Sequence, residues 1–186
     1  TIFAADLHMT TATSTSNTPL QFRLAQKNDA EAITALVNSA YRGDSSRAGW
    51  TTEADLLTGV RVQAEDVREI IETEGSMILL SLQQNEIVGS VNLLKTEDKA
   101  YLGMFAVNPL LQGAGIGKQF MQAAEALVKS EWHATAMWMT VITTRHELIA
   151  YYERRGYQRT GRLVAFPAEV PDECRLVKDI MMEELE

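Results

Sequence analysis

A strand, a turn and a glycine-rich helix start follow one another between residues 100 and 130, and this unit constrains the fold most. Residues 100–107 form an apolar run that Asn108-Pro109 stops. The segment Gln112-Gly113-Ala114-Gly115-Ile116-Gly117-Lys118 then leads into a stretch with a helical apolar period, from Ile116 to about Ser130. The sequence therefore predicts a strand–loop–helix unit whose helix begins among glycines.

Such a helix start is suited to binding an anion. The first backbone N–H groups of a helix have no partner within the helix, and its dipole favours negative charge beside them. Glycines remove the Cβ atoms that would hold a diphosphate away, and they permit positive φ angles. Lys118 adds a cation nearby. We therefore predict a pyrophosphate site at residues 112–118.

Two common nucleotide loops do not fit this spacing. A P-loop has a glycine five residues before its Gly-Lys pair and Ser or Thr after it, whereas Gln112 and Gln119 stand at those places. The dinucleotide fingerprint G-x-G-x-x-G also fails, because the spacing here is G-x-G-x-G. A glycine turn that only lets the helix pack closely, and another kind of phosphate-ligand protein, remain as alternatives.

Hydrophobic periodicity places the other elements around this unit. One helix is expected with Ile33, Leu36, Val37 and Ala40 on its apolar face. Others are expected over residues 65–74 and over His146–Arg155. Strands are expected at Leu20–Ala25, Met77–Leu82, Ile87–Leu94, Met137–Ile142, Tyr157–Thr160 and Cys174–Glu183. The pattern predicts an α/β fold, a single domain with a mixed, mostly antiparallel sheet flanked by helices over residues 20–186, after a flexible tail at residues 1–19.

Composition narrows the class of protein. The 186 residues are 46% hydrophobic and 23% charged, which is typical of one globular domain. The single cysteine, Cys174, and the lack of a visible secretory signal favour a reducing, cytoplasmic setting. No apolar run approaches the roughly 20 residues of a membrane span. The net charge of −8, with no basic cluster, argues against a nucleic-acid partner. It either simply keeps the protein soluble or mildly favours cationic small molecules over polyanions.

Two motifs give the chain a family resemblance. Gln112-x-x-Gly115-x-Gly117 resembles the Q/R-x-x-G-x-G/A coenzyme A signature of the GNAT superfamily, the Gcn5-related N-acetyltransferases. The run His146-Glu147-Leu148-Ile149-Ala150-Tyr151-Tyr152-Glu153-Arg154-Arg155-Gly156-Tyr157 is similar to the N-x-x-A-x-x-Y-E-x-x-G-F segment of the same family. The resemblance covers residues 20 to about 184 and is specific to the superfamily, without indicating one substrate.

This resemblance implies a function and a set of site residues. Acetyl-CoA would be the acetyl donor, with no metal, and a primary amine of a small molecule or peptide would be the acceptor. Phe105, Ala106 and Val107 would line pantetheine, and the Val107 N–H would polarise the thioester carbonyl. Tyr152 would protonate the departing thiolate, because a phenol with a pKa near 10 keeps its proton at neutral pH. Without the motif, Tyr152 would be interpreted as a core tyrosine beside Tyr151.

Two positions depart from the family pattern. His146 stands where the family has Asn, and it either donates a hydrogen bond to the cofactor or only caps a helix. Tyr151 is also expected to contact the cofactor. Tyr101 stands where some relatives have a glutamate base, and we expect it on the substrate side. A neutral phenol is a poor base, so the residue that deprotonates the amine stays open. Glu53 or Glu97 could act through water, or the amine could arrive already neutral.

The acceptor is expected to bind in the variable segment 41–53. Tyr41 and Trp50 could wall an apolar or cationic acceptor, and Glu53 could hold an ammonium group. Each of these residues could equally serve packing or a helix start. The leading hypothesis is acetyl transfer to an amine, and the alternative is a non-catalytic acyl-CoA-binding domain. Dimers are common among the proteins that this one resembles, and the sequence does not decide the oligomeric state.

Overall fold

The computed structural model describes residues 19–41, 60–113, 115–165 and 181–186, and for Met181 and Glu183 the backbone alone. Three predicted site residues, Trp50, Glu53 and Ala114, lie outside the described residues. The predicted tail lies outside them up to residue 18, as does Cys174. The expectations for these residues stay predictions.

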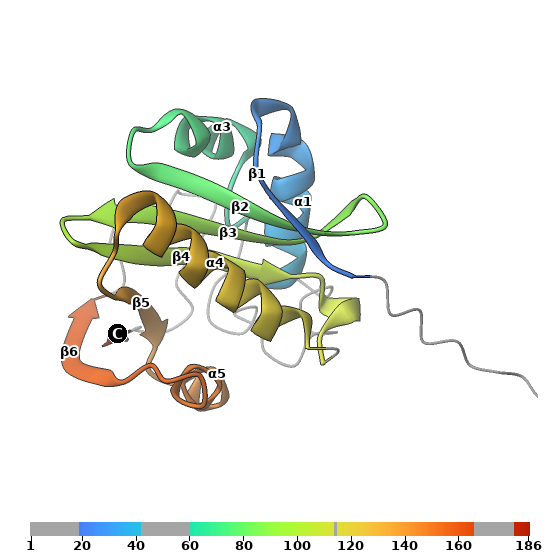
Figure 1. Ribbon diagram of the computed structural model, residues 1–186. Coiled ribbons are helices and arrows are strands. Elements are labelled where there is room, and N and C mark those ends of the chain that lie inside the picture. Colours follow the sequence, from blue (N-terminus) through green and yellow to red (C-terminus); the bar gives the residue numbers. More distant parts are fainter. Residues whose placement is uncertain (1–18, 42–59, 114, 166–180) are drawn as a thin grey trace, which may run out of the picture.

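The elements alternate much as the sequence predicts (Figure 1). The described strands are β1 Gln21–Leu24, β2 Ser76–Gln83, β3 Glu86–Thr96, β4 Lys99–Val107, β5 Met137–Ile142, β6 Arg159–Ala165 and β7 Met181–Leu185. The described helices are α1 Ala30–Tyr41, α3 Ala64–Glu72, α4 Ile116–Trp132 and α5 His146–Glu153, with short 3-10 turns at Lys27–Asp29 and Pro109–Leu111. The last two strands differ from prediction, since β6 runs beyond Thr160 and β7 ends two residues after Glu183.

The strands join in one sheet of order β1-β2-β3-β4-β5-β7-β6. Neighbouring strands are antiparallel except β4 and β5, which run parallel. The parallel pair follows from the chain path, because α4 carries the chain back across the sheet before β5 begins. The predicted mixed, mostly antiparallel sheet is confirmed.

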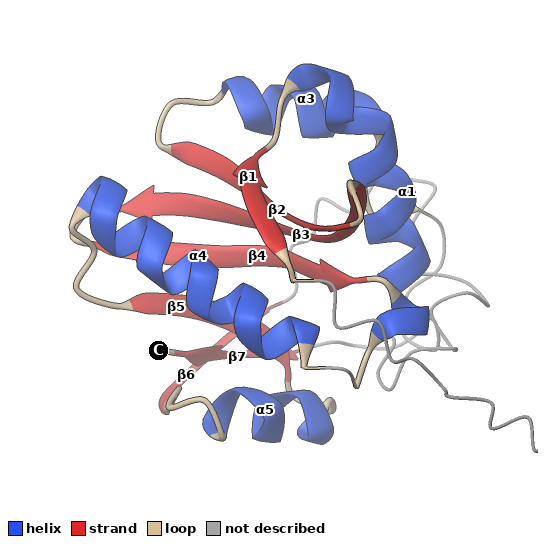
Figure 2. Ribbon diagram, turned by 45° about the vertical axis from the view of Figure 1, so that its right-hand side comes forward, coloured by secondary structure: helices blue, strands red, loops and turns tan. Residues whose placement is uncertain are grey.

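Helices cover both faces of the sheet (Figure 2). Helix α1 packs on β3 and β4, and α3 packs on β2 and on α1. The apolar face predicted for the first helix is buried there, with Ile33 and Val37 fully enclosed. Helix α4 lies on the opposite face and encloses Phe120 and Ala124 against the sheet. The core therefore has two layers, one on each face of the sheet.

Strand β4 contains a bulge that changes which residues face each layer. The register against β3 shifts between Ser90 and Asn92, opposite Met104, whose φ is 48°. Before the bulge, Ala100 and Leu102 face the α4 layer, and Tyr101 therefore points to the other face. After it, Val107 faces the α4 layer while Ala106 packs in the α1 layer. The bulge thus sets the side-chain directions at the end of the strand.

Strands β4 and β5 pair only where they start. Their parallel register is Ala100 with Met137 and Tyr101 with Trp138, and no pairing follows in the described residues. Beyond these two pairs the strands diverge, and a gap opens toward the carboxyl end of β4. Ligands bind at such carboxyl ends in many α/β folds. The fold thus places a candidate site between the end of β4 and the residues after β5.

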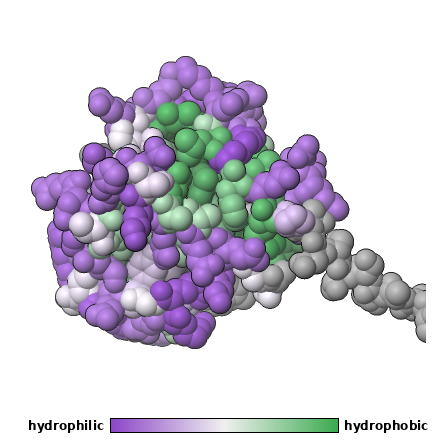
Figure 3. All heavy atoms as spheres, in the orientation of Figure 1, coloured by the Kyte–Doolittle hydropathy of each residue, from purple (hydrophilic) through white to green (hydrophobic). Residues whose placement is uncertain are grey.

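The outer end of the sheet keeps an apolar surface. In Figure 3, which has the orientation of Figure 1, hydrophobic atoms gather beside α4 over the first strands. Phe22 and Leu24 of β1 are 39% and 47% exposed, and the Phe22 ring stacks on Phe120 of α4 with centroids 6.0 Å apart. Strand β1 therefore covers the outer edge of the α4 layer.

None of the helices within the described residues is long and apolar enough for a membrane span.

Candidate active site

The glycine loop has the geometry that the sequence predicts. Strand β4 ends at Val107, the Asn108 side chain accepts a hydrogen bond from the Leu110 N–H, and α4 begins at Ile116. Gly113 and Gly115 have φ angles of 89° and 79°, in the left-handed region that disfavours other residues. Gly115 is the N-cap of α4. The unpaired N–H groups at the helix start are therefore presented by a loop without bulky side chains.

A side chain ties the two ends of this loop together. Gln112 Nε2 donates a hydrogen bond of 3.2 Å to the Val107 carbonyl oxygen. This bond fixes the end of β4 against the start of the glycine segment. The first residue of the predicted coenzyme A signature thus also positions the loop.

A cavity of about 580 Å³ opens at the carboxyl end of β4, between the glycine loop and α5. It is lined by Ala40, Tyr41, Phe105, Ala106, Val107, Pro109, Gln112, Gly113, Gly115, Gly117, Lys118, Arg145, Leu148, Tyr151, Tyr152, Arg154 and Arg155. Most predicted cofactor-binding residues that the structure describes are among them. Ile116 is not: its side chain is 5% exposed and packs in the core under α4.

The cavity wall is cationic although the whole protein is acidic. Lys118, Arg145, Arg154 and Arg155 line it, and none of its described lining residues is Asp or Glu. The chain as a whole has a net charge of −8. A partly enclosed concentration of cations attracts a polyanion locally, whatever the long-range field favours. This part of the molecule is therefore suited to a ligand with several phosphate charges.

Arg155 is held in place by Tyr151. Its guanidinium carbon lies 3.3 Å from the Tyr151 ring centroid, and Nη1 donates a 2.7 Å hydrogen bond to the Tyr151 carbonyl oxygen. Arg155 Nε is buried, and no described residue accepts a hydrogen bond from it. The Tyr151 hydroxyl in turn lies so close to Gly117 that a Cβ there would be 2.6 Å away. The pair thus connects α5 to the first turn of α4.

Tyr152 is buried at the inner end of the cavity. Its residue is 5% exposed, and its ring makes edge contacts with Tyr151 and Tyr157, at centroid distances of 5.3 and 5.9 Å. Burial raises the pKa of Tyr152 well above that of a free phenol; Tyr41 and Tyr151 add to this, and Arg145 and Arg155 oppose it. The hydroxyl therefore keeps its proton at neutral pH and can donate it.

The first turn of α5 presents Arg145 to the cavity in place of its neighbour His146. His146 is exposed and is not among the residues that line the cavity. Arg145, the N-cap residue of α5, is 7% exposed and does line it. The predicted contact of His146 with the cofactor therefore has no support from this geometry and stays a prediction.

The predicted acceptor residues fall in two places. Tyr41, at the end of α1, lines the cavity, and its hydroxyl donates a 2.9 Å hydrogen bond to the Phe105 carbonyl oxygen. Tyr101 lies outside the lining, with its ring over Gly103 and its hydroxyl 3.4 Å from Thr140 Oγ1. Tyr101 thus lies on the face opposite α4, beside the gap.

Sequence reasoning missed the cations that follow α5. The sequence analysis assigns no ligand-binding role to Arg154 or Arg155, although both line the cavity. A usable signal was present, because Arg155 follows Tyr151 by four residues and helical spacing places the two on one face.

Among the described residues, no group of three or more His, Cys, Asp or Glu side chains could hold a metal ion.

The fold and this site define a class of protein, an α/β domain in which a glycine-rich helix start and a buried tyrosine line one cavity. A model of the acetyltransferase (GNAT) family matches residues 30–157. That match covers more than half of the chain, so the protein belongs to the GNAT acetyltransferase family. The predicted resemblance is confirmed.

Solved structures agree with this family. The ribosomal-protein-S18-alanine N-acetyltransferase of Escherichia coli superposes with a TM-score of 0.65 at 12% identity, over 90% of this chain and 92% of the other. The IAA acetyltransferase of Bacillus cereus gives 0.61 at 16% identity, over 90% and 97%. The spermidine/spermine N-acetyltransferase of Vibrio cholerae gives 0.62 at 13%, over 89% and 90%. At such identities the likeness establishes the fold and leaves the acceptor open.

Comparison with curated protein sequences finds no match.

Proposed function

We propose that this protein transfers an acetyl group from acetyl-CoA to a primary amine of a small molecule or peptide. The observation that carries the proposal is the cavity, which joins a helix start without bulky side chains, four cationic side chains and the buried Tyr152. Anion binding and proton donation at one site are what transfer from a coenzyme A thioester requires. The cytoplasmic setting and a homodimer stay predictions from the sequence.

The cavity residues fit the chemistry of coenzyme A. Its pyrophosphate would lie against the N–H groups of residues 113–117, where Gly113 and Gly115 have no Cβ in the way. Lys118, Arg154 and Arg155 would bind its phosphate charges from the rim. Phe105 and Ala106, at the end of β4, would line the apolar part of the chain. The cofactor supplies the activated acetyl group, and the protein supplies position and charge.

Tyr152 would act as the general acid. When an amine attacks a thioester, the carbon–sulfur bond breaks and the sulfur leaves with an electron pair that a proton must neutralise. The raised pKa keeps the Tyr152 hydroxyl protonated for this step. The N–H of Val107 would donate to the carbonyl oxygen as negative charge develops there, a role carried over from the family resemblance.

A thiol-release assay tests the proposal. Purified protein is mixed with acetyl-CoA and a panel of primary amines that includes alkylamines, diamines and short peptides, and free thiol is followed spectroscopically. We expect release that depends on both the amine and the protein. Coenzyme A binding without release for any amine would instead support the non-catalytic acyl-CoA-binding alternative.

A further inference from the structure

The gap between β4 and β5 opens to both faces of the sheet. On one face lie α4 and α5, whose residues Phe120, Ile149 and Tyr152 pack in one core layer. Tyr41 comes from α1 on the other face, yet it lines the same cavity and bonds to Phe105 at the end of β4. The cavity thus reaches through the sheet. A donor held by the first turn of α4 leaves the α1 face for the acceptor.

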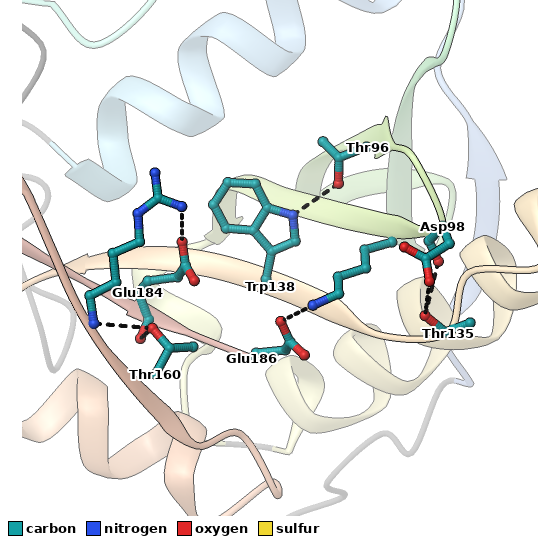
Figure 4. Close-up of polar contacts among 9 residues, drawn as sticks. Thr96, Asp98, Thr135, Trp138, Thr160, Glu184 and Glu186 are labelled. Atoms are coloured by element: carbon teal, nitrogen blue, oxygen red, sulfur yellow. Dashed lines mark hydrogen bonds and ion pairs between the residues drawn. The ribbon is translucent and has the colours of Figure 1, made fainter.

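The register of β7 places a carboxylate on that acceptor face. Met139 of β5 pairs with Leu185 of β7, and both are buried in the α4 layer. The next pair, Thr140 with Glu184, must therefore point to the opposite face, as Trp138 also does. Figure 4 shows Trp138 and Glu184 extending to the same side of the sheet.

Aromatic rings and hydroxyl groups lie on the same face of the sheet as this carboxylate, on the neighbouring strands. Tyr101 and Trp138 are paired neighbours on β4 and β5, with ring centroids 4.7 Å apart and planes at 59°. Trp138 Nε1 donates a 2.9 Å hydrogen bond to Thr96 Oγ1, which holds the indole in place. The Tyr101 hydroxyl lies 3.4 Å from Thr140 Oγ1, and Thr140 is the β5 partner of Glu184. Aromatic faces beside a carboxylate form an environment that binds ammonium groups.

Glu184 is shielded, whereas Arg162, the described residue that forms an ion pair with it, is exposed; Lys99, which is paired with Glu186, is a second cation whose charge interacts with Glu184. The Glu184 side chain is 13% exposed, whereas the side chain of Arg162 is 69% exposed. The two are 3.3 Å apart, and pairs with so exposed a member contribute little stability. A ligand cation can therefore displace the guanidinium, which remains hydrated when it leaves. The carboxylate itself stays at the sheet face beside the rings.

We propose that Glu184 binds a second positive charge of the acceptor, so that the protein acts on amines that carry another cationic group. This inference rests on the proposed function. From the pairs Ala100–Met137 and Tyr101–Trp138, Thr140 lies near the level of Gly103, four residues before Val107. Four residues at about 3.3 Å per residue correspond to about 13 Å along the strand, which the bulge at Met104 shortens, and this sets the separation between the reacting amine and the second charge. The reaction itself is unchanged, and Glu184 determines which amine is held in place.

The test compares two acceptors of equal length, diaminooctane and octylamine, which differ in the second ammonium group. Wild-type protein should have the lower KM for diaminooctane. The substitution Glu184→Gln should raise that KM roughly tenfold, because the carboxylate charge is lost while shape is kept. It should leave kcat for diaminooctane and KM for octylamine within about twofold. Glu131→Gln, which removes an exposed charge near the end of α4 on the opposite face, should change neither.

Each outcome decides the inference. A wild-type preference for octylamine, or a KM for diaminooctane that Glu184→Gln does not change, would overturn it. Coenzyme A affinity and thermal unfolding show whether the Glu184→Gln variant folds. If it does not fold, the preference of the wild-type protein between the two amines decides the question. If no tested amine causes wild-type protein to release thiol from acetyl-CoA, the proposed function itself fails. If it releases thiol with octylamine but its KM for diaminooctane is no lower, only the role of Glu184 fails.

Discussion

The two sides of the β4–β5 gap differ in how their charged side chains are arranged. On the α4 side, the cavity wall carries four cationic side chains and no carboxylate among its described residues. On the α1 side, Glu184 and Glu186 share a sheet face with Trp138, and each carboxylate is paired with a cation, Arg162 or Lys99. The net charge of −8 describes neither side. Under the proposed function, the polyanionic donor and the cationic acceptor would bind on opposite faces of one sheet, a separation that the total charge does not reveal.

The largest expected effect separates chemistry from packing at Tyr152. The substitution Tyr152→Phe should lower kcat by about 100-fold, because the general acid is lost, and should leave coenzyme A affinity unchanged. Stopped-assay thiol release and calorimetric titration measure the two quantities.

Tyr157→Phe is the matched control for this substitution. Tyr157 is also buried, contacts the Tyr152 ring and donates a 3.0 Å hydrogen bond to Glu125 Oε1, but it does not line the cavity. We expect Tyr157→Phe to cost about 1 kcal/mol of unfolding free energy and to leave kcat unchanged. Equal losses of kcat in both variants would show that Tyr152 serves packing.

A smaller effect tests whether the glycine loop binds the donor or only permits the turn. Gly115→Ala should weaken coenzyme A binding about tenfold, because the new Cβ lies beside the first N–H groups of α4. Gly156→Ala is matched in backbone strain, since the φ angles are 79° and 97° and neither Cβ would touch a neighbour. Both variants should lose roughly 1–2 kcal/mol of stability. If their coenzyme A affinities fall alike, the loop acts only as a turn.

The smallest effect concerns Arg155, two residues after the end of α5. Arg155→Gln should weaken coenzyme A binding several-fold, and the dependence of affinity on salt should decrease, because one charge-assisted contact to phosphate is lost. Lys129→Gln removes a cation from α4 outside the cavity lining and should leave both quantities unchanged. A salt dependence that is the same in wild type and Arg155→Gln would contradict the role of Arg155.

Much of the fold was predictable because its signals are local. Ile33, Leu36 and Val37 repeat with a helical period and form the buried face of α1. The strand–loop–helix unit was predictable from the stop at Asn108-Pro109 and the glycines before α4. The bulge at Met104 was not, since a positive φ in a residue other than glycine is imposed by the surrounding sheet.

The site was predictable where a motif spans it and not where strand register decides it. The second motif identified Tyr151 and Tyr152, and both line the cavity. Glu184 escaped notice because the last strand was expected to end at Glu183, whereas β7 runs from Met181 to Leu185. A register slip of one residue exchanges the faces of Glu184 and Leu185, and sequence alone does not fix the register of distant strands.

A calorimetric titration of the protein with coenzyme A, repeated in the presence of excess ATP, tests the central claim most directly. If the cationic cavity between α4 and α5 is the donor site, coenzyme A binds with one-to-one stoichiometry, and ATP weakens this binding only slightly because it lacks the pantetheine arm. Absence of heat with coenzyme A, or binding of ATP in preference to it, would contradict the account.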